Sequence, residues 1–512
     1  MSTVLDSALI EELAAIVGHE HVLCDEPTCA LASSDLFLWP GAVRAGAVLR
    51  PGSTAQLAQL ITVLARSGTA IVPRGAGLSY TAGAVPHAAS VVIDCLRLDQ
   101  ITVYPDDLYA LVGAGTSWQA LAEALKPYGL RAAQISPISG SHSTVGGAAS
   151  QNLPGGLDNI IGLTVVLADG TVVQTGSAAR AGASAFSRYA GPDLTGLFLG
   201  DCGAFGIKTQ VVVRLTVERE AAFASFSFDS ADAMLAALVC LRRRELVTRA
   251  LSMDQLKAKS AMRVDVAEAA SVVKAVVKQA GSVGRVFKDM VQLATGQNAV
   301  TGADWSLHLT VEAATEAIAQ AQMDLARAVC AVDGQEISNM IPKTMRAKPY
   351  SIRGLVGPDG ERWVPVHAIL PLSRAEACMR ALQEKLAGEG AALAAAGIQH
   401  SWIISTIGAY VTIEPMFYWR DQLDAIHMAH LSERNQARFA HGQVNSDARE
   451  LLIRLRAELR DLMREHDAVH GQMGRFYPYQ PLLESGTQDL VARIKHALDP
   501  ARSMNPGVLG LF

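Results

Sequence analysis

The chain has 512 residues, of which 50% are hydrophobic and 18% are charged, and its formal net charge is −5. This composition excludes a disordered chain, because disorder combines low hydrophobicity with high net charge. The acidic balance also argues against nucleic acid as a partner. Aromatic residues make up only 5%, so the apolar content lies mainly in smaller side chains, beside 43 glycines. At about 150 residues per domain, the length predicts two or three domains.

The sequence carries no targeting or membrane signal that we recognise. No stretch approaches the ~20 uninterrupted apolar residues of a spanning helix, and the first residues lack the basic start of a signal peptide. The seven cysteines are scattered, and only Cys24 and Cys29 are close together. An odd, dispersed set favours a reduced chain over a disulfide framework or a zinc site. We therefore predict a cytoplasmic protein.

Up to residue 215, short β-rich runs alternate with glycines and brief helical stretches. Apolar residues recur at helical spacing in 55–68, and a second amphipathic helix is expected at 117–129. The dipeptide Asp169-Gly170 between two apolar runs predicts a hairpin turn. Further strands are expected at 70–73, 90–96, 101–105 and 108–115. This mixture of parallel-type units and hairpins indicates an α+β arrangement.

After residue 215 longer helical segments are expected, the first at 230–252. Strand–helix–strand alternations follow, and they predict one antiparallel sheet with helices on a single face, forming a cap domain. Its strands are expected at 306–314, 363–373 and 402–419, and a last helix at 489–500. A basic stretch at 256–289, which includes Lys257, Lys259 and Arg263, is either a solvated helix face or a contact with an anionic membrane or an acidic partner.

A glycine-rich loop follows the strand at 70–73. Glycines permit a left-handed backbone and bring N–H groups close to a ligand, so such a loop can bind an anion. The loop has neither the Gly-Lys-Ser/Thr of a Walker motif nor the GxGxxG that opens a dinucleotide-binding helix. Its residues are Pro73, Arg74, Gly75, Ala76, Gly77, Leu78, Ser79 and Tyr80.

Three further elements follow this first loop (73–80): a second loop (139–150), a third loop (199–209) and a C-terminal loop (505–507). Four such elements in this order resemble the FAD-binding domain of the vanillyl-alcohol oxidase / p-cresol methylhydroxylase (PCMH) superfamily, which includes FAD-linked D-lactate and glycolate dehydrogenases. The resemblance implies an α+β fold, with a two-subdomain PCMH-type FAD-binding domain. The implied division is 1–218 for FAD binding, 219–489 for the substrate or cap domain, and 490–512 for a return to the FAD domain.

The resemblance also implies where FAD binds. The first loop would wrap the pyrophosphate, and Asn505 would approach the flavin from the C-terminal loop. Ser79 stands near the place where some members attach FAD through a histidine, so we expect non-covalent FAD. The segment 201–205 reads DCGAF where the family usually has SEGTL, which leaves its side-chain contacts open. Outside the first loop, the expected cofactor residues are Ser139, Gly140, Ser143, Thr144, Gly146, Gly147, Gly203, Gly206, Ile207 and Asn505.

A polar and aromatic cluster at 465–479 is the first candidate for catalysis. By resemblance His470 would be the base or the hydroxyl ligand, and Arg475 would hold a substrate carboxylate in a bidentate pair. Tyr477 or Tyr479 would donate a hydrogen bond. The alternative is a helix end with solvated charges followed by a packed turn.

Two further candidates lie in predicted strands. His367 is isolated in an apolar run, where a histidine is usually a hydrogen-bonded core residue, but the resemblance also makes it a catalytic candidate. Glu414 lies in a run that resembles family sequence. The His-rich GDGN segment of metal-dependent relatives is missing, so we expect no metal, although His367, His400 and Glu414 could meet in space.

These observations predict an FAD-dependent oxidoreductase that removes hydride from an alcohol carbon, most simply that of a 2-hydroxy acid such as D-lactate or glycolate. A quinone, a cytochrome or oxygen would accept the electrons. One alternative is an aryl-alcohol or alkylphenol oxidase, because Arg475 with Tyr477 and Tyr479 could stabilise a phenolate. Another is a non-catalytic FAD electron-transfer subunit. A homodimer and a peripheral membrane contact stay open.

Overall fold

The computed structural model describes residues 5–133, 139–151, 153, 157–262, 304–350, 355–357 and 359–512. The chain divides into two compact units. Unit 1 comprises Met1–Glu218, Leu423–Gln436 and Gly471–Phe512, and unit 2 comprises Arg219–Gln422 and Ala437–His470. The chain therefore rejoins unit 1 at 471 rather than at the expected 490. The reason is local: the backbone N–H groups of Arg475 and Phe476 both donate to the carbonyl of Thr81.

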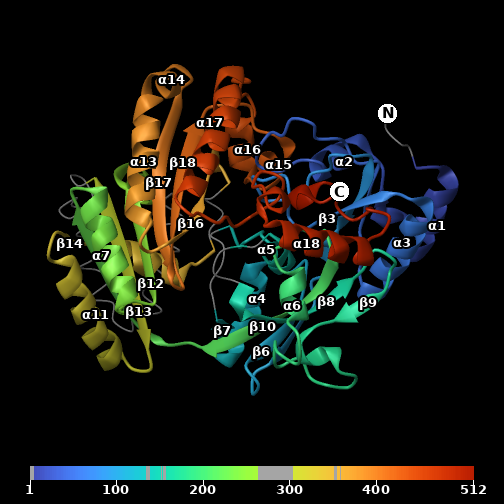
Figure 1. The fold of residues 1–512 in the computed structure, drawn as a ribbon, viewed down its shortest axis with the longest axis horizontal. Coiled ribbons are helices and arrows are strands. Elements are labelled where there is room, and N and C mark those ends of the chain that lie inside the picture. Colours follow the sequence, from blue (N-terminus) through green and yellow to red (C-terminus); the bar gives the residue numbers. More distant parts are fainter. Residues whose placement is uncertain are drawn as a thin grey trace. The chain divides into compact units, whose positions relative to one another are not determined.

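The first sheet of unit 1 has the order β1-β2-β4-β3, in which β4 is parallel to both β2 and β3 (Figure 1). Helix α3 begins after Ser53, whose side chain accepts from the N–H of Gln56, and ends at Gly68, which has φ 69°. This confirms the helix expected at 55–68. Bounds are α1 (Ser7–Val17), β1 (Val22–Leu23), α2 (Glu26–Ala32), β2 (Ala47–Leu49), α3 (Thr54–Ser67), β3 (Ala70–Arg74) and β4 (Ser90–Asp94).

The second sheet of unit 1 is antiparallel, with the order β5-β6-β10-β8-β9 and with β7 also paired to β10. The hairpin β8–β9 turns at Gly170, which has φ 89°, as the Asp-Gly dipeptide predicts. Bounds are β5 (Ile101–Tyr104), β6 (Tyr109–Gly113), α4 (Trp118–Leu125), β7 (Leu130–Ala132), α5 (Val145–Ser150), β8 (Ile160–Val166), β9 (Val172–Gln174), α6 (Leu194–Phe198) and β10 (Ile207–Val217).

Later segments complete unit 1. The C-terminal residues, red in Figure 1, return to the first sheet, where Met504 forms a parallel bridge with Ile71. The segment Leu423–Gln436 also belongs to this unit. Bounds are α15 (Ala425–Ala429), α16 (Glu433–Phe439), which runs on into unit 2, and α18 (Ser485–Leu498).

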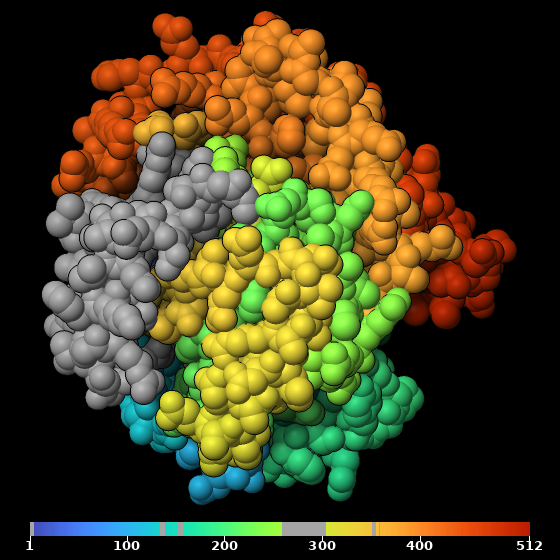
Figure 2. Space-filling model, turned by 90° about the vertical axis from the view of Figure 1, so that its left-hand side faces the viewer, coloured from blue at the N-terminus to red at the C-terminus, as the bar shows by residue number. Residues whose placement is uncertain are grey.

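Unit 2 is built on one antiparallel sheet with the order β14-β11-β13-β12-β17-β18-β15, and β16 also pairs with β18. Helices α7 and α11 lie side by side over β11 and β13 (Figure 1), and Figure 2 shows α11, in yellow, at the surface. This confirms the α+β class and the antiparallel cap sheet. Bounds are β11 (Glu220–Phe228), α7 (Ala231–Arg243), β12 (Arg249–Asp254), α8 (Gln255–Met262), β13 (Trp305–Ala313), α11 (Glu316–Cys330), β14 (Gln335–Ile337), α12 (Met340–Ala347), β15 (Arg362–Pro365), β16 (Ala368–Pro371), α13 (Ala375–Gly388), α14 (Gly390–Ala395), β17 (Ile398–Ile407), β18 (Tyr410–Trp419) and α17 (Ser446–Glu465).

Three expectations for unit 2 were wrong in detail. The run at 402–419 is not one strand but spans the antiparallel hairpin of β17 and β18. The helix expected at 230–252 ends at Arg243, and the last residues of that range belong to β12, because they pair with both β13 and β17. The run at 363–373 is two short strands rather than one, and both pair with β18. Among the helices of the described residues, none is long and apolar enough to cross a membrane.

Candidate functional site

The glycine loops of unit 1 meet around a cleft that holds about 950 Å³ of space, counting the part open to solvent. Tyr80, Gly140 and Asn505 do not line it. The predicted cofactor residues that do line it are Pro73, Arg74, Gly75, Ala76, Gly77, Leu78, Ser79, Ser139, Ser143, Thr144, Gly146, Gly147, Gly203, Gly206 and Ile207. The structure therefore gathers at one cleft residues that lie more than a hundred positions apart in the sequence.

Glycines let the loops approach one another across this cleft. A Cβ atom added at Gly75 would lie 2.3 Å from Oγ1 of Thr144. The backbone of the first loop therefore packs directly against the Thr144 side chain of the second loop. Gly203 has φ +75°, and a Cβ atom there would lie 2.3 Å from Cγ of Pro73. Because Pro73 is a rigid ring, this contact leaves no room for a side chain. The glycine spacing thus fits a cradle for an elongated cofactor.

Gly203→Ala should weaken FAD binding by at least about tenfold, because the new Cβ would push the third loop away from Pro73. The left-handed backbone adds strain of about 1–2 kcal/mol for an L-residue. Gly182→Ala is the matched control, since Gly182 has φ +73° but nothing within 4 Å of an added Cβ. Titration of the apoprotein with FAD measures both variants. Equal affinities would show that the contact with Pro73 is irrelevant to the cofactor.

Buried polar groups hold the first loop in place. The carboxylate of Asp35 accepts hydrogen bonds from the backbone N–H groups of Phe37 and Ala82 and from Nε1 of Trp39. Burial raises the pKa of Asp35 to about 6. Nη1 of Arg74 donates to the carbonyls of Ala32 and Ser34. These bonds anchor the first loop to the segment before β2.

The second loop ends in a helix cap. Thr144 is the N-cap of α5, and its Oγ1 accepts from the N–H of Gly147 at 3.1 Å. The N–H of Gly146 donates to the carbonyl of Ala114 at 2.9 Å. The side chain of Thr144 and the backbone of both glycines are thereby fixed at the wall of the cleft.

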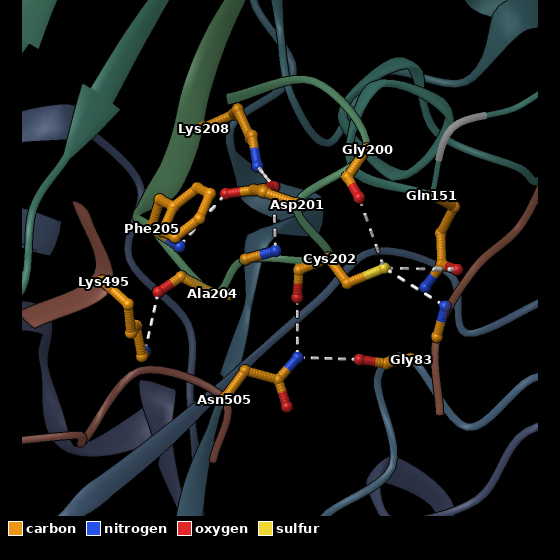
Figure 3. Close-up of polar contacts among 12 residues, drawn as sticks. Gly83, Gln151, Gly200, Asp201, Cys202, Ala204, Phe205, Lys208, Lys495 and Asn505 are labelled. Carbon is orange, nitrogen blue, oxygen red and sulfur yellow. Dashed lines mark hydrogen bonds and ion pairs between the residues drawn. The ribbon is translucent and has the colours of Figure 1, made fainter. Parts of the chain in front are cut away.

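The third loop and the C-terminal loop are joined by Asn505 (Figure 3). Its Nδ2 donates to the carbonyls of Gly83 and Cys202 at 2.8 and 2.7 Å. Asn505, predicted to approach the flavin, ties two segments that line the cleft to the C-terminal loop. Cys202, which the sequence did not single out, lines the cleft, and burial raises the pKa of its thiol to about 12, so the thiol is protonated.

Arg475 was predicted to hold a substrate carboxylate, but its guanidinium is engaged within unit 1. Nη1 donates to the carbonyl of Ala82 at 2.7 Å, and Nη2 donates to Oδ1 of Asn505 and to the carbonyl of Pro506, both at 2.8 Å. Burial lowers the pKa of Arg475 to about 10. These contacts give Arg475 a structural role at the C-terminal loop.

The two candidate tyrosines follow Arg475 in unit 1. Tyr477 is fully buried, and its ring lies 4.7 Å from that of Phe476. Tyr479 precedes a short 3₁₀ helix at Gln480–Leu482. Neither lines the cleft. Tyr477 therefore fits the packed-turn alternative better than a substrate donor.

The other three candidates lie in unit 2. Nδ1 of His470 lies 2.8 Å from the carbonyl oxygen of His367. His367 occupies the break between β15 and β16, where Val366 donates to the carbonyl of Pro415 and Ala368 pairs with Ile413. This register places His367 opposite Glu414 of β18. The sheet thus pairs residue 367 with residue 414, and the imidazole of His470 contacts the backbone of His367.

Burial sets the charge state of this group. It raises the pKa of Glu414 to about 7, an effect that the nearby ammonium of Lys257 opposes. It lowers the pKa of His470 to about 4, so the imidazole is neutral near pH 7. A carboxyl group that titrates near neutrality is suited to taking up a proton.

Lys257, which belongs to the basic stretch at 256–289, makes specific side-chain contacts in unit 2. Its Nζ donates to the hydroxyl of Tyr418 at 2.9 Å and lies 5.8 Å from the ring centre of Trp363. The stretch from 263 onward lies outside the described residues. Among the residues that are described, no group of three or more His, Cys, Asp or Glu side chains could hold a metal ion.

Comparison with known proteins identifies FAD as the cofactor. A family model described as an FAD binding domain matches residues 45–176. The chain is 32% identical over 184 residues to glycolate oxidase subunit GlcD of Bacillus subtilis, which covers 34% of this chain and 37% of that protein. It is 29% identical over 207 residues to a mitochondrial D-lactate dehydrogenase [cytochrome] of Arabidopsis thaliana, covering 38% and 35%. The chain thus spans little more than a third of the length of these relatives.

Solved structures resemble the whole chain. 4-Ethylphenol oxidase from Gulosibacter chungangensis has a TM-score of 0.70 at 18% identity, covering 99% of this chain and 97% of that one. p-Cresol methylhydroxylase has a TM-score of 0.70 at 16% identity, covering 98% and 96%. At these identities the likeness shows the fold alone.

Proposed function

We propose that this chain, which carries an FAD binding domain and resembles the vanillyl-alcohol oxidase / p-cresol methylhydroxylase superfamily, is an FAD-dependent oxidoreductase that oxidises the alcohol carbon of a 2-hydroxy acid. The carrying observation is the carboxyl group of Glu414 on the sheet of unit 2, opposite His367 in register and near the ammonium of Lys257. The class of substrate is supported by the glycolate and D-lactate enzymes that the FAD domain resembles.

The cleft of unit 1 fits FAD, since its glycines leave a cradle that side chains would fill. The first, second and third loops would hold the cofactor. When bound, the flavin supplies the acceptor for the substrate hydride. Ser79 is buried and its Oγ lies 3.0 Å from Oγ1 of Thr81, and a serine hydroxyl offers no histidine-type attachment at this place. We therefore propose non-covalent FAD.

Glu414 is the group that we propose takes the hydroxyl proton. A general base works best when its pKa is near the working pH, and burial gives Glu414 that property. The carbonyl of His367 accepts from His470, which puts the proton on Nδ1 and the lone pair on Nε2. A neutral Nε2 can accept or relay a proton.

Lys257 and Tyr418 replace Arg475 in this proposal as donors for the substrate carboxylate. Arg475 is bound to two carbonyls and Asn505, whereas Lys257 lies near Glu414 and shares a hydrogen bond with Tyr418. An ammonium and a phenol side by side can bind a carboxylate with charge-assisted hydrogen bonds.

Anaerobic titration of the holoprotein tests the function. Glycolate and the two enantiomers of lactate should bleach the flavin absorbance, and alkylphenols or vanillyl alcohol should not. Bleaching by phenols alone would replace the proposal with an alkylphenol oxidase. Failure of every donor would favour an electron-transfer subunit. Acid precipitation of the same sample should release the flavin into the supernatant, as non-covalent binding requires.

A further inference from the structure

We propose that Lys208 is a cofactor-binding residue, whose ammonium group donates to an acceptor atom of the bound FAD. Lys208 is the second residue of β10 and lines the cleft. It lies opposite Val165 of β8, a strand that is buried throughout. Only 3% of Lys208 is exposed, so its charge is costly to bury without compensation. The proposal concerns the cofactor and stands whatever the substrate is.

Asp201 compensates part of this cost. Its carboxylate forms an ion pair with Nζ of Lys208 and also accepts from the backbone N–H groups of Gly203 and Phe205 (Figure 3). The carboxylate thus has three donors. Asp201 belongs to the DCGAF segment in which this chain departs from the pattern of the family, so the departure supplies the partner of a lysine on the wall of the cleft.

The ammonium group of Lys208 has donors to spare. An ammonium has three N–H groups, and within the described part of the chain Nζ of Lys208 has one hydrogen-bond acceptor, Oδ1 of Asp201. A second buried lysine at the same loop shows the contrast. Nζ of Lys495 donates to Oδ2 of Asp499 at 2.6 Å and to the carbonyls of Ala204 and Met504 at 2.8 and 2.9 Å.

The two lysines therefore differ in function although both are buried ion-pair partners. Lys495 uses all three donors within the protein, one of them to tie α18 to Ala204 of the third loop, and it does not line the cleft. Lys208 uses one donor for the protein, and it lines the cleft. FAD offers phosphate, ribose and adenine acceptors to such a group. A cation with N–H donors on the wall of the cleft matches that chemistry.

The experiment compares two double variants of the full chain, D201N/K208M and D499N/K495M, each of which removes one buried ion pair without leaving a lone charge. Titration of each apoprotein with FAD, followed by flavin fluorescence, gives the dissociation constant. Urea unfolding of each apoprotein gives its stability. We expect D201N/K208M to weaken FAD binding at least about tenfold and D499N/K495M less than about threefold, with both variants less stable.

Equal weakening in both variants would overturn the proposal, because it would mean that each pair only holds the loop. Unchanged affinity in D201N/K208M would overturn it as well. If the double variant does not fold, K208R against K495R gives the comparison with each buried charge kept, and we expect K208R to weaken FAD binding more than K495R. FAD binding by the wild-type apoprotein is measured in the same series, independently of any alcohol substrate, so failure of the 2-hydroxy-acid assignment would leave this result standing.

Discussion

Replacement of Glu414 by Gln should slow substrate-dependent flavin reduction by about 10²–10⁴-fold, the range expected for loss of a general base. Glutamine keeps the size and one acceptor oxygen of Glu414 but cannot take up a proton. Single-turnover stopped-flow reduction with the best hydroxy acid measures the effect. Glu220→Gln is the control, since Glu220 is an exposed carboxylate at the start of β11 and should not affect the rate. A Glu414→Gln variant within threefold of wild type would remove Glu414 from the chemistry.

The pH dependence gives a second readout of the same residue. Burial raises the pKa of Glu414 from 4.5 to about 7, so the wild-type rate should rise with pH through about 7 as the carboxylate forms. In the folded state the proton is held more tightly than in the unfolded state, so this group lowers stability as pH rises from about 4.5 to about 7. Glu414→Gln should lose both effects. A pH profile that persists in the variant would assign the titration to another group.

The loops that line the cleft could be predicted because their glycine spacing is a local feature of the sequence. Fifteen of the eighteen predicted cofactor residues line the cleft, since loops of this kind work through the backbone and need small residues at fixed positions. The three exceptions, Tyr80, Gly140 and Asn505, show where a local sequence pattern no longer predicts the position of a side chain. Asn505 has the expected position in the chain, but its amide faces the carbonyls of Gly83 and Cys202, which only the folded backbone brings near.

The catalytic cluster was predicted less well, for a topological reason. His470 and Arg475 are neighbours in sequence, but the chain passes from unit 2 to unit 1 between residues 470 and 471. The guanidinium of Arg475 donates to backbone carbonyls in unit 1. Because every residue has a carbonyl, no sequence pattern predicts which of them will accept. The juxtaposition of His367 with Glu414 depends on the pairing of β15 and β16 with β18, and the ion pair of Lys208 with Asp201 forms only when the third loop folds. Such features follow from tertiary structure rather than from local pattern.

Asn505→Ala should destabilise the protein by about 2–5 kcal/mol, because it leaves the buried carbonyls of Gly83 and Cys202 without a donor and removes one of the acceptors of Arg475. The alanine would also have to adopt φ 43°, a left-handed conformation that asparagine tolerates better. FAD affinity should fall with it, since Cys202 lines the cleft and Gly83 does too. Urea unfolding of the apoprotein and FAD titration measure the two effects.

Asn505→Asp separates the donor contacts of the Asn505 side chain from its acceptor contact with Arg475. Aspartate keeps the oxygen that accepts from Arg475 and keeps the tolerance for a left-handed backbone, but it has no N–H donors for the carbonyls of Gly83 and Cys202. If the donors join the loops, as the geometry indicates, Asn505→Asp should be nearly as unstable as Asn505→Ala and should bind FAD as weakly. If only the hydrogen bond to Arg475 mattered, Asn505→Asp would behave like the wild type. Arg475 would then be the residue that links the C-terminal loop to the cleft.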